Sequence, residues 1–114
     1  MTKLRIWVST LVLMNIFALP VQAENRALLI GVGKYENPSA NLSGIDLDIG
    51  MMKDAARKMG YEDSQIKVLL DGQSTYKNVK RTIKSWLVNG VGKNDHVFFY
   101  FSGHGAQTRD YNND

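Results

Sequence analysis

The residue best suited to chemistry in this sequence is His104, which lies in the turn Ser102-Gly103-His104-Gly105. An imidazole can act as a general base near neutral pH, and it can also bind a metal ion. The two glycines leave room for a substrate backbone to approach, and they allow unusual φ and ψ angles. A lone histidine is more often structural, but this setting favours a catalytic base.

The segment that must position His104 is the run Val97 to Phe101, in which every residue is apolar or aromatic. Such a run predicts a strand that is buried on both faces, as in the middle of a parallel sheet. The turn with His104 would then lie at the carboxyl end of that strand, where open α/β sheets place their ligands. We therefore expect an exposed imidazole there.

Metal binding and serine catalysis are the two other chemistries that His104 could serve. The second histidine, His96, lies eight residues earlier, or roughly 25 Å away at a strand rise of about 3.3 Å per residue, so the two cannot share a metal ion. Ser102 does not lie in a Gly-x-Ser-x-Gly motif, and its spacing from His104 suits a serine nucleophile poorly. His-Gly turns also form oxyanion holes in lipases and esterases, so part of an α/β-hydrolase is an alternative.

Two further strands and two helices are predicted before this segment. Residues 26–31 and 66–70 are short apolar runs that end at a glycine or a turn. A helix from about Ile45 to Gly60 follows the first strand, and a second helix, capped by Ser74 or Thr75, follows the next. The alternation of strands and helices predicts an α/β fold with a parallel sheet.

Each predicted helix has an apolar stripe at helical spacing. In the first helix we expect the buried stripe to consist of Leu47, Met51, Ala55 and Met59, with Met52 and Ala56 beside it. In the second helix the buried residues are expected to be Val79, Ile83, Trp86 and Leu87. The basic residues of the second helix, at a similar spacing, predict a solvated face rather than a nucleic-acid site: Lys77, Lys80, Arg81 and Lys84.

The glycine-rich start of the loop after the first strand, Gly31-Val32-Gly33, invites a nucleotide-binding interpretation. The third glycine of a dinucleotide-binding motif would fall at Glu36, and no helix follows directly. Lys34 is followed by Tyr35 rather than by Ser or Thr, so the Walker motif fails as well. The sequence therefore argues against a nucleotide cofactor.

The first 23 residues have the layout of a secretory signal peptide. Lys3 and Arg5 form a positive start, residues 6–19 are mostly apolar, and small residues precede a cleavage point after Ala23. The apolar run is shorter than the roughly 20 residues that span a bilayer, which disfavours an uncleaved anchor. We expect a signal peptide over 1–23 and export to a periplasmic or extracellular space, with no membrane attachment after cleavage.

Net charge and cysteine content argue against two further features, a nucleic-acid partner and disulfide bonds. Because Lys3 and Arg5 belong to the predicted signal peptide, its removal lowers the formal net charge from +3 to +1, and no nucleic-acid partner is indicated. The sequence has no cysteine, so it can form no disulfide.

Residues 106–114 are polar, and an open sheet that ends in an apolar strand needs further strands beside it. We therefore expect 24–114 to be the N-terminal part of a larger domain.

Three segments together resemble the caspase-like cysteine peptidases (peptidase family C14), on the metacaspase side of that family. They are Arg26–Gly31, Leu42–Asp48 and Val97–Gly105, in the family's order and with helices between them. The resemblance implies a three-layer α/β/α sandwich with a mostly parallel sheet. It also implies a cysteine-type endopeptidase acting on peptides or proteins.

The resemblance assigns roles to three residues. His104 matches the catalytic histidine of a Cys–His dyad, and the backbone N–H of Gly105 matches a donor of the oxyanion hole. Asp48 matches an acidic residue of the S1 pocket that binds Arg or Lys of the substrate, and Leu42 stands where animal caspases have an arginine. From the residues alone, Asp46 and Asp48 favour the simpler role of stabilising the amino end of a helix.

The sequence also departs from the family pattern. Ile45 stands where metacaspases often have a cysteine, and the nucleophilic cysteine is expected beyond Asp114. A chain without that thiol is expected to be inactive alone, so an inactive module that binds peptides or partners is the non-enzyme alternative. Calcium dependence is allowed by the resemblance only, and no other cofactor is expected.

Overall fold

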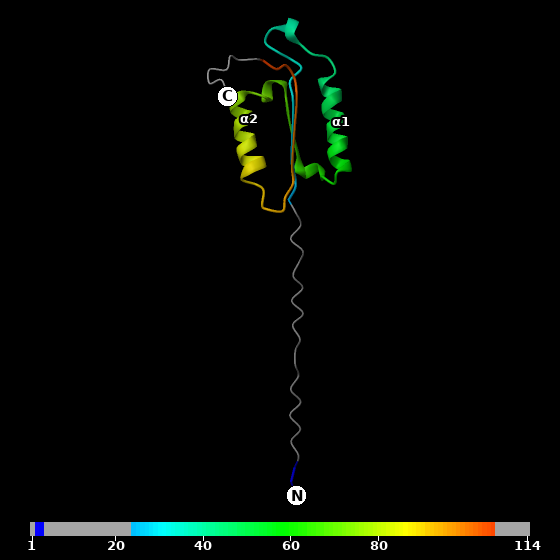
Figure 1. The fold of residues 1–114 in the computed structure, drawn as a ribbon, viewed down its shortest axis with the longest axis vertical. Helices are drawn as coiled ribbons and strands as arrows, with labels where there is room; N and C mark the ends of the chain where they lie inside the picture. Colours follow the sequence, from blue (N-terminus) through cyan, green and yellow to red (C-terminus); the bar gives the residue numbers. More distant parts are fainter. Residues whose placement is uncertain (1, 4–23, 107–114) are drawn as a thin grey trace, which may run out of the picture.

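The computed structural model describes residues 2–3 and 24–106, and residues 24–106 form a sheet between two helical layers (Figure 1). The signal peptide predicted over residues 1–23 lies outside the described residues except for residues 2 and 3. The main elements are β1 (Arg26–Gly31), α1 (Ile45–Lys58), β2 (Ile66–Leu70), α2 (Tyr76–Thr82) and β3 (Val97–Ser102). Short helical turns η1 (Pro38–Ala40), η2 (Asp63–Gln65), η3 (Asp71–Gln73) and η4 (Ile83–Val88) complete the order. None of the helices in this described part is long and apolar enough to cross a membrane.

The three strands form one parallel sheet in the order β2-β1-β3, which confirms the predicted α/β class. The central strand β1 is the core of the domain, because its residues from Ala27 to Ile30 are at most 1% exposed. Gly31 at the end of β1 pairs with both Leu70 and Ser102. The loops after all three strands therefore start side by side at the carboxyl edge of the sheet.

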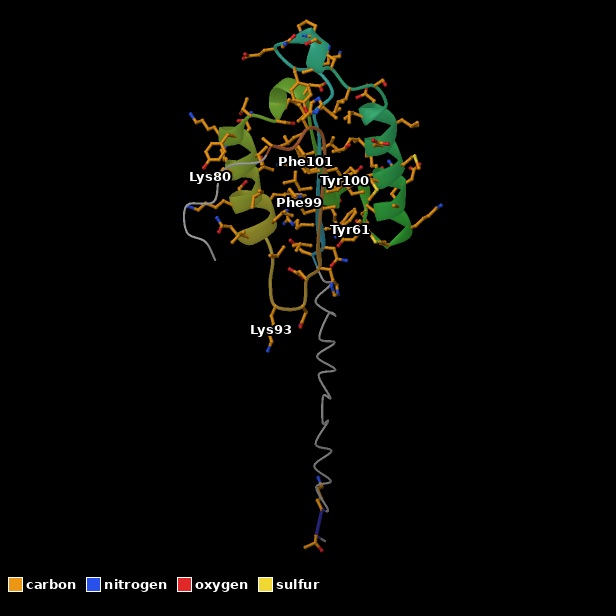
Figure 2. All side chains as sticks on the ribbon, turned by 45° about the horizontal axis from the view of Figure 1, so that its top comes forward. Tyr61, Lys80, Lys93, Phe99, Tyr100 and Phe101 are labelled. Atoms are coloured by element: carbon orange, nitrogen blue, oxygen red, sulfur yellow. The ribbon has the colours of Figure 1, made fainter. Side chains whose placement is uncertain are left out.

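Strand β3 is less buried than its apolar sequence predicts. Val97, Phe99 and Phe101 are 53%, 49% and 48% exposed, whereas Phe98 and Tyr100 pack against the core beneath α1. Figure 2 shows Tyr100 on the α1 side of the sheet and Phe99 on the α2 side. The prediction of a strand buried on both faces is wrong for the described residues. The reason is that β3 pairs only with β1 there, and the helical layer on the α2 side packs over β1.

Helix α1 turns a different stripe to the sheet from the one predicted. Its buried residues are Ile45 and Ile49, together with Ala56, which was expected beside the predicted stripe. Leu47, Met51 and Met59 of that stripe are 67%, 62% and 55% exposed. Contact with β1 decides between the two apolar stripes, because a Cβ atom at Gly31 would lie 2.8 Å from side-chain carbons of both Ile45 and Ile49. A glycine in the strand therefore lets the branched side chains of α1 approach closely.

The second helix begins as predicted, with the Thr75 hydroxyl accepting a hydrogen bond from the Asn78 N–H at 3.2 Å. After Thr82 it continues as a π-helical turn, in which the Asn89 N–H bonds to the Lys84 carbonyl at 2.9 Å. The Trp86 indole N–H donates to the Ala27 carbonyl at 2.9 Å, which anchors this layer on β1. The four basic residues of this helix are exposed, as expected for a solvated face: Lys77, Lys80, Arg81 and Lys84.

The two stripes of α1 predict a clear contrast in stability. Ile49→Ala leaves a cavity against Gly31 and should lower the free energy of unfolding by about 2 to 5 kcal/mol. Leu47→Ala, on the exposed stripe, is the matched control and should change it by less than about 0.5 kcal/mol. Urea denaturation of the purified chain measures both values. Equal losses for the two variants would contradict the packing of α1 through Ile45 and Ile49.

Candidate active site

The candidate site is built from the three loops at the carboxyl edge of the sheet. The loop after β1 carries Tyr35 and the turn η1, and the loop after β2 begins with Asp71. The turn after β3 carries His104, as predicted. Because the strand ends are in register, segments almost 70 residues apart in the sequence come into hydrogen-bond contact.

The imidazole of His104 is exposed and is held on one of its two nitrogens. Its Nε2 atom lies 2.7 Å from the backbone oxygen of Ala40. A carbonyl oxygen can only accept a hydrogen bond, so Nε2 carries the proton and donates it. In the neutral ring the lone pair then lies on Nδ1, which is the nitrogen that can accept a proton. The ring of Tyr35 packs beside the imidazole, with its centroid 4.9 Å away.

The backbone of the same turn is held by Tyr35 as well. The His104 N–H donates to the Tyr35 hydroxyl oxygen at 2.8 Å. A Cβ atom at Gly103 would lie 3.1 Å from that oxygen and 3.0 Å from the Phe101 ring. Neither Gly103 nor Gly105 has a positive φ, so the expected unusual backbone angles are not found at these glycines. The glycine at 103 serves to make space for the tyrosine, and a Cβ at Gly105 would meet no atom of the described residues within 4 Å.

Asp71 anchors the loop that contacts His104. Its Oδ1 atom accepts hydrogen bonds from the backbone N–H groups of Gly33 at 2.9 Å and Lys34 at 3.0 Å. These two bonds stabilise the carboxylate and lower the pKa of Asp71 below its usual value. Asp71 has a φ of 46°, a left-handed conformation that aspartate tolerates better than most residues. The loop is closed further by the Tyr35 N–H, which donates to the Asn41 side chain at 2.8 Å.

Asp48 lies in the first turn of α1 and reaches the end of β3. Its Oδ2 atom accepts a long hydrogen bond of 3.4 Å from the hydroxyl group of Ser102, two residues before His104. Asp48 is half-buried, whereas Asp46 in the same turn is exposed. Of these two acidic residues the structure therefore brings Asp48, and not Asp46, to the end of the strand that carries His104.

Sequence reasoning missed three contributors to this site: Tyr35, Ala40 and Asp71. Ala40 acts through its backbone oxygen, so no side chain could have pointed to it. His96 lies before β3, at the opposite end of the strand from His104, as predicted. Within the described residues no three His, Asp or Glu side chains are grouped so that they could hold a metal ion.

Comparison with known proteins shows which family this sequence is similar to. The sequence model of a family described as "Caspase domain" matches residues 24–114. The chain is 36% identical to Metacaspase-1 of Eremothecium gossypii over 96 residues and 34% identical to Metacaspase-3 of Arabidopsis thaliana over 98 residues. It is 37% identical over 90 residues to a protein named Inactive metacaspase-4 of Trypanosoma brucei brucei.

These matches cover most of the chain but a minor part of each relative. The shares of the chain are 78%, 80% and 72%, whereas the shares of the three relatives are 21%, 26% and 25% in the same order. The chain therefore spans about a quarter of the length of the curated relatives that it matches.

The bonds to Asp71 predict an acid-sensitive contribution to stability. Because its pKa is lowered in the folded chain, the carboxylate stabilises the fold above its unfolded pKa of about 3.9, and this contribution is lost as the pH falls through the folded value. Asp71→Asn should lower the unfolding free energy at pH 7, and its difference from the wild type should shrink towards pH 3. Urea denaturation across this range measures the difference. A difference that does not vary with pH would contradict the assignment.

Proposed function

The chain belongs to the caspase-domain family of peptidases, and we propose that it supplies the histidine side of a cysteine-type endopeptidase active site. The supporting observation is the exposed imidazole of His104, whose Nε2 is held by the Ala40 carbonyl at 2.7 Å. This bond leaves Nδ1 as the proton acceptor at the end of a strand. An oriented base of this kind is what activation of a thiol requires.

The proposed reaction proceeds by acyl transfer. Nδ1 of His104 takes the proton of a cysteine thiol, and the thiolate attacks the carbonyl carbon of the scissile peptide bond. The backbone N–H of Gly105 donates to the oxygen on which negative charge develops. His104 returns the proton to the leaving amine, and water then hydrolyses the thioester. The printed sequence contains no cysteine, so the thiol must come from outside these 114 residues.

A preference for arginine or lysine before the scissile bond is the proposed specificity. The half-buried carboxylate of Asp48 lies at the end of the strand that carries His104, and the Ser102 hydroxyl is directed at it. A cationic side chain would find in Asp48 a fixed partner of opposite charge. Leu42, in the position of the arginine of animal caspases, offers no cation for an aspartate.

The second candidate is an inactive caspase-like module that binds peptides. It is favoured by the lack of cysteine in the sequence, and one relative is itself named as an inactive metacaspase. Reading the gene beyond codon 114 separates the two candidates. A further strand that ends in Asp-x-Cys supports the peptidase, whereas a stop codon directly after Asp114 supports the inactive module. Membership of the caspase family argues against the α/β-hydrolase alternative, which requires a downstream Gly-x-Ser-x-Gly.

Replacing the histidine tests the proposed base. In the protein encoded by the complete reading frame, His104→Ala should lower kcat/KM for peptide hydrolysis by about 10³-fold or more, since the thiol loses its proton acceptor. His96→Ala is the matched control, because it lies at the opposite end of β3, and it should leave kcat/KM unchanged. Circular dichroism checks that both variants fold. Full activity of a folded His104→Ala protein would show that His104 is not the catalytic base.

Replacing Asp48 tests the proposed specificity. In the same protein, Asp48→Ala should lower kcat/KM for peptides with arginine before the scissile bond by about 10²-fold or more, because the cation loses its partner. Asp46→Ala, in the same turn but exposed, should have little effect on that value. Kinetics on a fluorogenic arginine peptide give both results. Equal activity of the Asp48→Ala and Asp46→Ala variants would dismiss the assignment.

A further inference from the structure

We propose that Asp95 binds the α-ammonium group of a processed chain that begins at Glu24. The inference rests on the signal peptide predicted over residues 1–23 and on contacts at the amino edge of the sheet. It does not depend on the proposed peptidase activity. It makes the Ala23–Glu24 bond a processing site and Asp95 the receptor for the new terminus.

The contact that carries the proposal joins the backbone nitrogen of Glu24 to the side chain of Asp95. The Glu24 N–H donates to Asp95 Oδ1 at 2.8 Å. The other carboxylate oxygen, Oδ2, accepts a hydrogen bond from the Gly92 N–H at 2.6 Å. The carboxylate is therefore already held in place by its own loop, and it needs no rearrangement to receive a ligand at Oδ1.

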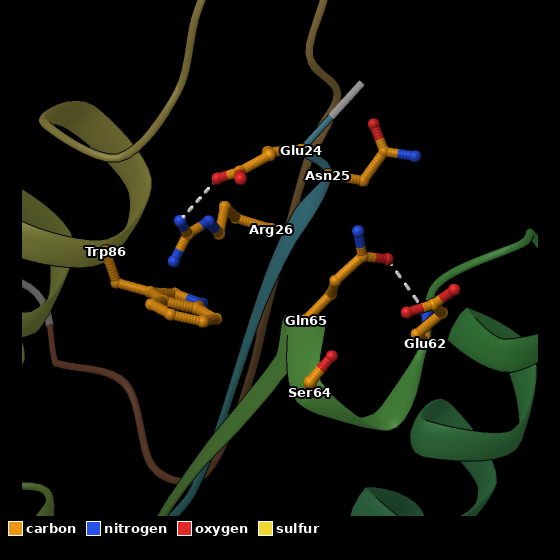
Figure 3. A pocket seen from close by; sticks show the side chains of 7 residues that line it. All are labelled: Glu24, Asn25, Arg26, Glu62, Ser64, Gln65 and Trp86. Carbon is orange, nitrogen blue, oxygen red and sulfur yellow. Dashed lines mark hydrogen bonds and ion pairs between the residues drawn. The ribbon is translucent and has the colours of Figure 1, made fainter. Parts of the chain in front are cut away.

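The position of the Glu24 nitrogen is fixed by contacts that residues 24–26 themselves make. The His96 N–H donates to the Asn25 side chain at 3.0 Å, and the Arg26 N–H donates to the His96 carbonyl at 3.0 Å. The Glu24 carboxylate pairs with Arg26 at 2.9 Å, and the Arg26 guanidinium lies 4.0 Å from the Trp86 ring centroid. Figure 3 shows the Glu24–Arg26 pair directed towards Trp86. Cleavage before Glu24 would leave all of these contacts intact.

Processing would change the chemistry of this nitrogen but not its place. A signal peptidase hydrolyses the Ala23–Glu24 peptide bond with one water, whose oxygen becomes part of the Ala23 carboxylate. The Glu24 nitrogen leaves as an amine and takes up a proton near neutral pH. A neutral amide donor thereby becomes an ammonium group, and 2.8 Å is a normal length for its bond to a carboxylate.

Other charged groups near this position set the background against which Asp95 acts. The Glu24 carboxylate is already paired with Arg26. Glu24, Arg26 and Glu62 line one cavity of about 400 Å³. Lys93 lies in the loop that ends at Asp95, and His96 directly follows it. Among these groups, Asp95 is the carboxylate that already accepts a hydrogen bond from the Glu24 nitrogen.

The test follows the reactivity of the α-amine in the exported protein. The full chain, with its own first 23 residues, is expressed in an exporting bacterium, and the mass of the purified product gives its N-terminus. Acetylation of the Glu24 amine at pH 7 is then followed by peptide mapping. An ammonium group paired with Asp95 should react about two- to fivefold more slowly than in Asp95→Asn, which is the range for an exposed ion pair. Glu62→Gln, which removes a carboxylate from the cavity that Glu24 also lines, is the control and should retain the slow rate.

Two results would overturn the proposal. One is an N-terminus at a residue other than Glu24. The other is an equal acetylation rate in the wild type and Asp95→Asn. If Asp95→Asn does not fold, the wild type alone decides the question, by comparison of its rate in buffer and in concentrated urea. Slower acetylation in buffer, relative to a short peptide under the same two conditions, supports the pairing, and equal relative rates refute it.

Discussion

The candidate site depends on one hydrogen bond, between Nε2 of His104 and the backbone oxygen of Ala40. It joins the turn after the last strand to the loop after the first, and it decides which ring nitrogen carries the proton. An exposed histidine without such a partner exchanges tautomers and rotamers freely, and it is a poor base for a defined nucleophile. The bond therefore turns a solvent-facing imidazole into a directed proton acceptor on Nδ1.

This bond requires the loop that carries Ala40 to be held in place, and residues of that loop are held by contacts with the loops after β2 and β3. Asp71 holds its start through the N–H groups of Gly33 and Lys34, and Tyr35 holds its middle against the His104 backbone. Asp71 follows β2 and His104 follows β3, so the central strand β1 and its loop receive support from both neighbouring strands. Such convergence of three loops is a consequence of parallel strands in register.

The order of elements and the exposure of His104 could be predicted from the sequence, because strand length, helix spacing and glycine turns are local signals. The face of α1 could not, because both of its stripes are apolar and the choice is made by the fit of Ile45 and Ile49 against Gly31. The exposure of β3 was missed because the apolar content of a strand does not reveal its place in the sheet. Tyr35 and Asp71 were missed because loop contacts across three strands leave no pattern in a single sequence.

Polar contacts at the two ends of β3 hold this strand in place, whereas burial holds the central strand β1. Its apolar side chains at Phe99 and Phe101 are half exposed, so packing alone fixes the strand weakly. At its amino end Asp95 and His96 bond to residues 24–26, and at its carboxyl end His104 bonds to Tyr35 and Ala40. A slip of one residue would break both sets of bonds and would turn the side chains of β3 to the opposite face. The two ends together thus hold the register that places Ser102 beside Asp48 and His104 beside Ala40.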